Sequence, residues 1–302
     1  KMKNSKKLSL YGNLIFDSVH CVKDLKHNAS NEGVNNYTSV GAIGNVLRAV
    51  EKIDKDLNVK IYSQIGLDHY GSYIKNWLQE FKSKASIKIE DNVIVNPLAK
   101  TTNAVIISDL FKINRSSIVN WGACADMTNF EIDETDWAHI MYADTLENLD
   151  ENFLKRVSDK SILSMDLCLS NYSEERKTWI ISMLKYVDYL IVSDVEAAGL
   201  MSSTISGAAW RSFCTEETAN FLGSRVKNRA IIHTPHGSTV SNGKNIHSYT
   251  SRYITNKNLN VLGAGDIFAS SFITGMLNSG NLEESIAFAH ENTTSSLQQR
   301  EK

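Results

Sequence analysis

Short apolar runs alternate with longer amphipathic segments along most of the chain. The runs of strand length lie at residues 8–16, 59–65, 139–143, 162–167, 189–192 and 230–234. Apolar residues recur at helical spacing at residues 40–53, 68–81, 151–157, 174–184, 215–222 and from 267 onward. Strands that alternate with helices predict a mostly parallel sheet with helices on both faces, which is a three-layer α/β fold.

Two segments, residues 18–39 and 88–121, do not follow this alternation. The first is polar and rich in Asn and His, and the second holds repeated strand-like runs. We expect the two segments to pair into a small accessory sheet. Because the sequence shows no linker, repeat or low-complexity tract, we expect a single domain over residues 1–302.

Composition narrows the class of protein. The chain has 302 residues, 42% of them hydrophobic and 22% charged, and a net charge of −2, so no basic surface indicates binding to nucleic acid or to an anionic membrane. No apolar run approaches a membrane span, and the run after the basic N-terminus is too interrupted for a signal peptide. Four scattered cysteines without metal spacing favour a reducing, cytoplasmic location.

The segment Gly263-Ala264-Gly265-Asp266 leads from a loop into the helix that begins near Ile267. The first N–H groups of a helix lack partners within it, and the helix dipole is positive there, so the segment can seat a phosphate. The same groups favour the ionised form of Asp266, which could accept the proton of an attacking hydroxyl. A glycine turn with an Asp near a helix start is also common, and this segment alone fits both interpretations.

Other phosphate and metal motifs are missing from the sequence. Gly243-Lys244 has Ser238 where a P-loop needs its first glycine, and Phe268 stands where a dinucleotide fingerprint needs its third. The eight histidines have no zinc-ligand spacing.

Six motifs follow one another along the chain: Gly12 and Asp17 at the end of the first strand, 40–45 (Val-Gly-Ala-Ile-Gly-Asn), 66–71 (Gly-Leu-Asp-His-Tyr-Gly), 115–122, 193–196 (Ser-Asp-Val-Glu) and 263–266. Taken together, they resemble the ribokinase-like (PfkB) carbohydrate kinase family over nearly the whole chain. Several motifs in the family's order are more specific than any one of them.

The resemblance implies an ATP-dependent kinase that uses Mg²⁺ and phosphorylates a small sugar or polyol. Asp266 is implied as the base, and the backbone of Gly263, Ala264 and Gly265 as the phosphate cradle. The remaining implied residues are Asp17, Gly41 and Asn45 for the sugar, Glu196 for Mg²⁺ through water, and Ser193, Thr234, Gly237 and His290 around the nucleotide. The accessory strands, residues 18–39 and 88–121, are implied to close over the sugar as a lid.

Three of these residues also fit a structural role. Asp17 could end a strand at a turn, Asn45 could cap a helix, and Glu196 could be a carboxylate in the first turn of a helix.

The chain departs from the family pattern mainly on the nucleotide side. Asn260-Val261 replaces an Asp-Thr pair, which puts a monovalent-cation (K⁺) site in doubt, and Ser193 replaces an Asn. The stretch from Asp166 to Ser170 lacks an expected amide and an expected cation. These losses leave two alternatives to a sugar kinase open: a non-catalytic sugar or nucleotide sensor, and a nucleoside kinase. Exposed edges of the lid strands could also pair two subunits into a homodimer.

Overall fold

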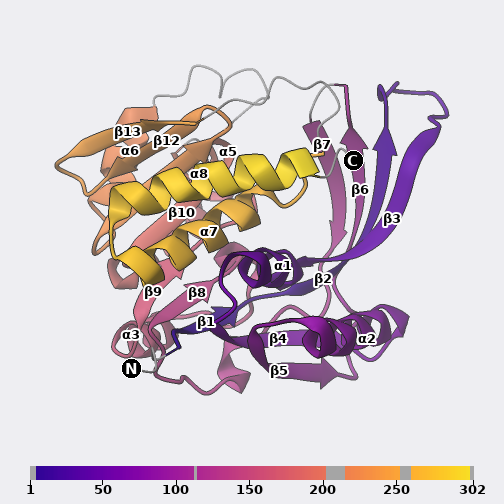
Figure 1. Cartoon of the computed structure of the whole chain (residues 1–302), viewed down its shortest axis with the longest axis horizontal. Coiled ribbons are helices and arrows are strands. Elements are labelled where there is room, and N and C mark those ends of the chain that lie inside the picture. The colour runs from indigo at the N-terminus through magenta and orange to yellow at the C-terminus, as the bar shows by residue number, and fades with distance from the viewer. Residues whose placement is uncertain (1–4, 112–113, 202–214, 252–259, 300–302) are drawn as a thin grey trace.

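A computed structural model describes residues 5–111, 114–201, 215–251 and 260–299 (Figure 1). Two sheets organise these residues. One is a large central sheet between two layers of helices, and the other is a small sheet that stands beside it. The three-layer α/β fold with a mostly parallel sheet is therefore confirmed.

Within the described residues, nine strands form the central sheet. Their spatial order is β13 (Ile246–Thr250), β12 (Gly237–Ser241), β11 (Arg229–Thr234), β10 (Tyr189–Ser193), β9 (Ile162–Met165), β8 (Trp137–Ile140), β1 (Lys7–Tyr11), β4 (Asn58–Gly66) and β5 (Lys88–Asn96). The strands from β11 to β5 run parallel, and β12 and β13 are antiparallel at one edge. The parallel strands therefore all end at the same edge of the sheet.

Each face of the central sheet has its own apolar core. The helices on one face are α1 (Ile43–Ile53), α2 (His69–Lys84), α7 (Ala264–Ser279) and α8 (Leu282–Gln298). The helices on the other are α3 (Glu151–Ser158), α4 (Glu174–Met183), α5 (Asp194–Met201) and α6 (Thr215–Gly223). The described part of the chain also has three short 3-10 helices, η1 (Met127–Asn129), η2 (Ala143–Thr145) and η3 (Leu184–Tyr186). Strand residues alternate between the cores: Leu8 and Leu10 of β1 pack on the first face, and Tyr11 packs on the second.

The predicted first strand, residues 8–16, is two strands in two different sheets. The strand β1 ends at Tyr11, and β2 (Leu14–Val22) begins the small sheet. Between them, Asn13 is fully buried, and its side chain accepts from the Ala125 N–H at 2.8 Å. Its amide also donates to Thr145 at 3.0 Å. A polar side chain held inside the protein in this way ends the first strand, although the apolar run continues past it.

The small sheet has the order β3 (Gly33–Ala42), β2, β6 (Asn103–Asp109) and β7 (Asn114–Asn120). The expected accessory sheet of residues 18–39 and 88–121 was therefore partly wrong. Residues Lys88–Asn96 form β5, which pairs in parallel with β4 along its whole length, at the edge of the central sheet. The helix α2 connects β4 to β5, and such a crossover places the second strand parallel to the first.

No described helix has the length and apolar character needed to span a bilayer. Cys21, Cys124 and Cys168 are free thiols, and Cys214 lies outside the described residues.

Candidate active site

A pocket of about 520 Å³ opens at the carboxyl ends of four neighbouring parallel strands. Tyr142 and Asp166 follow β8 and β9, Ser193 ends β10, and Thr234 ends β11, and all four line the pocket. The start of α7 and the inner face of the small sheet complete it. In open α/β sheets, this edge is the usual place for a ligand.

The glycine segment 263–266 lies at the floor of this pocket and forms the N-terminus of α7, as predicted. Gly263 precedes the helix in a left-handed conformation, with φ 72° and ψ 13°, which favours glycine. The first hydrogen bond along the helix runs from the Ile267 N–H to the Gly263 carbonyl at 3.0 Å. The N–H groups of Gly265 and Asp266 come before it in the chain and therefore have no carbonyl partner within the helix. The Ala264 N–H donates to the Val261 carbonyl at 3.1 Å. A turn therefore already uses the Ala264 N–H, and the predicted place of Ala264 in the phosphate cradle stays a prediction.

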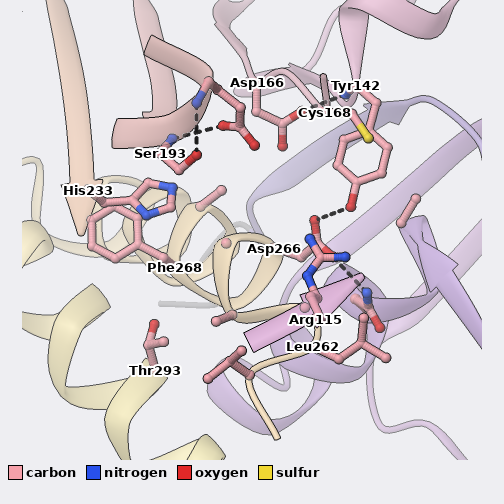
Figure 2. Close-up of a pocket in the computed structure, with 18 of the residues that line it drawn as sticks. Arg115, Tyr142, Asp166, Cys168, Ser193, His233, Leu262, Asp266, Phe268 and Thr293 are labelled. Carbon is pink, nitrogen blue, oxygen red and sulfur yellow. Dashed lines mark hydrogen bonds between the residues drawn. The ribbon is translucent and has the colours of Figure 1, made fainter. Parts of the chain in front are cut away.

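The Asp266 carboxylate is 4% exposed and is held by donors on both oxygens. Asn45 Nδ2 donates to Oδ2 at 2.6 Å, and the Tyr142 hydroxyl donates to Oδ1 at 3.0 Å (Figure 2). Burial raises the pKa of Asp266 to about 6, and the charge of Asp166 acts in the same direction, against the two hydrogen bonds. Asn45 lies in the first turn of α1, and the N-cap of that helix is Ala42, so a capping role for Asn45 is wrong.

Asp17 lies on β2 and faces the pocket from the small sheet. Burial raises its pKa to about 7, the negative charge of Asp266 raises it further, and Arg115 and Arg48 lower it. Gly41 does not line the pocket but packs against this carboxylate: a Cβ at residue 41 would lie 2.3 Å from Asp17 Oδ2. The lack of a side chain at Gly41 therefore leaves room for Asp17.

The predicted nucleotide residues are only partly brought together. Ser193, Thr234 and His290 line the pocket. Gly237 does not: it begins β12 with φ 153°, and a Cβ there would lie 1.9 Å from the Tyr249 carbonyl oxygen. Its glycine is needed for the close approach of two strands, and its role at a nucleotide site stays a prediction.

Aromatic rings form one wall of the pocket beside these residues. His233 stacks on Phe268 with ring centres 4.7 Å apart, and His290 meets the edge of Phe268 at 4.9 Å. Burial lowers the pKa of His233 to about 3 and that of His290 to about 4, so both rings are neutral at pH 7. His290 is also bonded to the Ser238 hydroxyl at 2.7 Å.

Ser193 and Glu196 form a capping box at the start of α5. The Ser193 N–H donates to Glu196 Oε2 at 2.8 Å, and the Glu196 N–H donates to Ser193 Oγ at 3.3 Å. The helix-start role of Glu196 is confirmed, and its role toward Mg²⁺ stays a prediction. Burial raises the pKa of this carboxyl group to about 8.

The pocket is rich in carboxyl groups. Of the described residues that line it, five are acidic (Asp17, Asp166, Asp194, Glu196 and Asp266) and Arg115 is the only Lys or Arg. Within the same parts of the chain, no three His, Cys, Asp or Glu side chains are grouped to hold a metal ion. The available donors are hard carboxylate oxygens, which suit an Mg²⁺ ion that keeps its waters and is shared with phosphates.

Sequence reasoning missed Tyr142 as a pocket residue and named Asp166 only as the start of a divergent motif. Both follow parallel strands, which is the one signal that could have marked them. Nothing in the local sequence shows that the Tyr142 hydroxyl reaches residue 266.

A profile of the pfkB family of carbohydrate kinases matches residues 5–301. The chain belongs to this family. A search of curated proteins gives no significant match. The predicted family resemblance is confirmed, and the protein is a kinase.

Many solved structures share the fold of this kinase. Adenosine kinase from Sinorhizobium meliloti aligns with a TM-score of 0.76 and 14% identity, over 98% of this chain and 94% of that one. Fructokinase from Vibrio cholerae aligns with a TM-score of 0.70 and 14% identity, over 98% and 99%. Ribokinase from Thermotoga maritima aligns with a TM-score of 0.66 and 18% identity, over 97% and 92%. At these identities the likeness concerns the fold, which kinases named for different acceptors share.

Proposed function

We propose that this kinase transfers the γ-phosphoryl group of ATP to a hydroxyl of a small sugar or polyol, with Asp266 as the base. One observation carries the proposal: the Asp266 carboxylate and the leading N–H groups of α7 lie in the same pocket as Asp17 and Asn45. A carboxylate and an amide suit the adjacent hydroxyls of a sugar, because one accepts hydrogen bonds and the other both donates and accepts.

In the proposed step, the acceptor hydroxyl gives its proton to Asp266 and its oxygen forms a bond to the γ-phosphorus. The bond from that phosphorus to the bridging oxygen breaks, and ADP leaves with the electron pair. The Gly265 and Asp266 N–H groups stabilise the charge on the moving phosphoryl group. A pKa of about 6 suits Asp266 to this task, since the group is ionised at pH 7 and still basic.

The charges of the pocket support a requirement for Mg²⁺. With carboxyl groups at five described lining positions and a single Arg, the pocket offers little positive charge to a bare polyphosphate, so the donor would bind with a divalent cation. Mg²⁺ supplies charge neutralisation on the phosphates when bound, and the carboxylates of Glu196, Asp194 and Asp166 are the residues that could hold its waters. On the same side, Ser193, Thr234 and His290 would border the nucleotide, and Phe268 would pack against it.

We do not include a monovalent cation in the proposal. Asn260 stands where the family has Asp, and its amide donates to the Tyr37 hydroxyl at 2.8 Å. This contact connects the loop before α7 to β3. The Asn260 side chain has no carboxylate that could bind K⁺ at this position.

The four-stranded sheet is proposed to act as the lid of a single domain. Asp17 and Arg115 both reach the pocket from it, so its position controls two charged groups of the site. Its edge strands β3 and β7 are the proposed dimer contact, and Val105 and Ile118 of this sheet are exposed large apolar side chains. Sedimentation of the purified protein tests the dimer.

A nucleoside acceptor is the second candidate, and the apolar lining of the lid favours it. Ile15, Ala104, Ile106, Val119 and Trp121 all line the pocket from this sheet or its end. A bare sugar has little apolar surface to place there, whereas a base attached to a sugar does. The structural neighbours include the adenosine kinase from Sinorhizobium meliloti.

The test is a coupled ADP-release assay with Mg-ATP and a panel of sugars, polyols and nucleosides, with and without K⁺. We expect turnover with at least one acceptor, and competition between a sugar and adenosine separates the two acceptor classes. Asp266→Asn should keep ligand-induced thermal shifts and lose turnover by about 10²–10⁴-fold. Asp133→Asn is the matched control, because Asp133 pairs with Lys60 outside the pocket.

Near-normal turnover of Asp266→Asn would remove Asp266 as the base. Ligand-induced thermal shifts with no ADP release by the wild type, across the whole panel, would contradict the proposal and favour the sensor.

A further inference from the structure

Tyr142 adopts a left-handed backbone conformation two residues after the end of β8, with φ 52° and ψ 48°. A residue with a bulky side chain rarely adopts it, because Cβ crowds the following carbonyl group. Conformations of this kind persist only where surrounding bonds hold them, and they gather at functional sites.

Hydrogen bonds to Asp166 and Thr145 hold the backbone of this turn. The Tyr142 N–H donates to Asp166 Oδ1 at 2.5 Å, and the Ala143 N–H donates to the Asp166 carbonyl at 3.1 Å. The Tyr142 carbonyl accepts from the Thr145 N–H at 2.8 Å and from the Thr145 hydroxyl at 2.7 Å. The backbone of Tyr142 is therefore fixed at both its donor and its acceptor, and its side chain is directed into the pocket (Figure 2).

The ring reaches across the pocket to α7, where its hydroxyl donates to Asp266 Oδ1 at 3.0 Å (Figure 2). Asn45 holds the other oxygen at 2.6 Å. The two donors approach from different elements, so together they define the orientation of the carboxylate plane. Each carboxylate oxygen has two lone-pair sites, so one site on each remains for a ligand.

We propose that Tyr142 is a positioning residue for phosphoryl transfer, whose hydroxyl holds the Asp266 carboxylate in one orientation. The inference rests on the proposed role of Asp266 as the base. It gives the left-handed turn after β8 a function, because from this turn the ring points at residue 266. The ring spans the distance to α7, and the hydroxyl makes the hydrogen bond that orients the Asp266 carboxylate.

Electrostatics supports this role. Hydrogen bonds from Tyr142 and Asn45 lower the pKa of Asp266, against burial and the charge of Asp166. The titratable and charged groups that face Asp266 and Tyr142 from the surrounding elements are Asp17 (β2), Arg115 (β7), Asp166 and Cys168 (after β9), His233 (β11) and His290 (α8). The two histidines are neutral at pH 7, since burial lowers the pKa of each. Removing the hydroxyl changes none of these charges, and so it isolates one hydrogen bond.

The test is Tyr142→Phe, which keeps the ring and removes the hydroxyl. With an acceptor that supports turnover, kcat/KM is measured from pH 5 to pH 9 at saturating ATP. We expect the acidic limb of the profile to move to higher pH by about 0.5–1 unit. We also expect kcat at pH 8 to fall about 3–10-fold and the KM for ATP to stay within about twofold.

Tyr62→Phe is the matched control. Its hydroxyl also donates to a carboxylate, Asp133, but lies outside the pocket, so the profile of this variant should match the wild type. Tyr142→Gly is a second variant, which relieves the backbone conformation. It should fold and lose at least as much turnover as Tyr142→Phe.

An acidic limb unchanged in Tyr142→Phe, or shifted equally in Tyr62→Phe, would overturn the inference. This outcome differs from failure of the proposed function, in which the wild type itself releases no ADP, or Asp266→Asn turns over normally.

Discussion

Asn45 Nδ2 donates to Asp266 Oδ2 at 2.6 Å and joins the first turns of α1 and α7 across 221 positions of the chain. Asn45 Oδ1 accepts from the Arg48 guanidinium at 2.5 Å. The guanidinium therefore determines which end of the amide faces the carboxylate, because it can only donate.

Asn45→Asp tests this contact, because it replaces a donor with a second carboxylate beside Asp266. Two neighbouring carboxylates cannot both ionise easily, so the pKa of Asp266 should rise and less of the base should be ionised at pH 7. We expect kcat/KM to fall about tenfold or more at pH 7 and to recover in part at pH 9. Asn278→Asp is the control, since Asn278 donates to Asp54 at 3.0 Å on the surface. A loss that is the same at every pH would contradict the explanation.

Asp17→Asn should stabilise the ligand-free protein at alkaline pH. The pKa of folded Asp17, about 7, lies above its usual value of 3.8, so the protonated group favours the folded state. That contribution is present below about pH 4 and is lost as the pH rises through 7. Removing the charge should therefore raise stability at pH 8 by about 2–4 kcal/mol, and much less at pH 4. Thermal unfolding at pH 4, 6 and 8 measures the difference.

Asp133→Asn should lower the stability of the folded protein at pH 8, which is the opposite of the effect expected for Asp17→Asn. Hydrogen bonds from Lys60 and Tyr62 lower the pKa of Asp133, so its ionised form favours the folded state. That contribution is present above the usual pKa and lost as the pH falls. If both variants changed Tm in the same direction at pH 8, burial of Asp17 would not be the cause of its effect.

Gly237→Ala separates a structural role from a role in nucleotide binding. A Cβ there would meet the Tyr249 carbonyl oxygen at 1.9 Å, and φ is 153°, so we expect a Tm lower by several °C. The KM for ATP of the folded enzyme should stay near normal. Gly280→Ala is the control, because it also has a positive φ but has no atom within 4 Å of the added Cβ. A large rise in the KM for ATP without loss of Tm would instead support a direct role of Gly237 in nucleotide binding.

Sequence reasoning located the Gly263–Asp266 corner and the side chains of Asp17 and Asn45 correctly in one pocket. It did so because strand ends and helix starts have local signals, such as glycine and the change of hydrophobic period. It was wrong about Lys88–Asn96, since an isolated apolar run does not show which strand it will pair with. It could not show that Gly237 lets β12 approach Tyr249 closely, because one glycine fits both a phosphate loop and a tight strand pair.

Tyr142 shows most clearly what local signals omit. Its backbone conformation depends on Asp166 and Thr145, and its hydroxyl acts on a residue 124 positions away. None of these contacts has a periodicity or a spacing that could be read along the chain.

By itself, the sequence determined the alternation of strands and helices, hence the layered sheet, and the helix start at Gly263. Both depend on interactions between residues close in the chain. The tertiary structure alone decided which carboxyl groups share one poorly solvated pocket and which donors reach them. Proximity and burial shift the pKa of Asp17 to about 7 and that of Asp266 to about 6, and distant segments create both conditions only when they pack together.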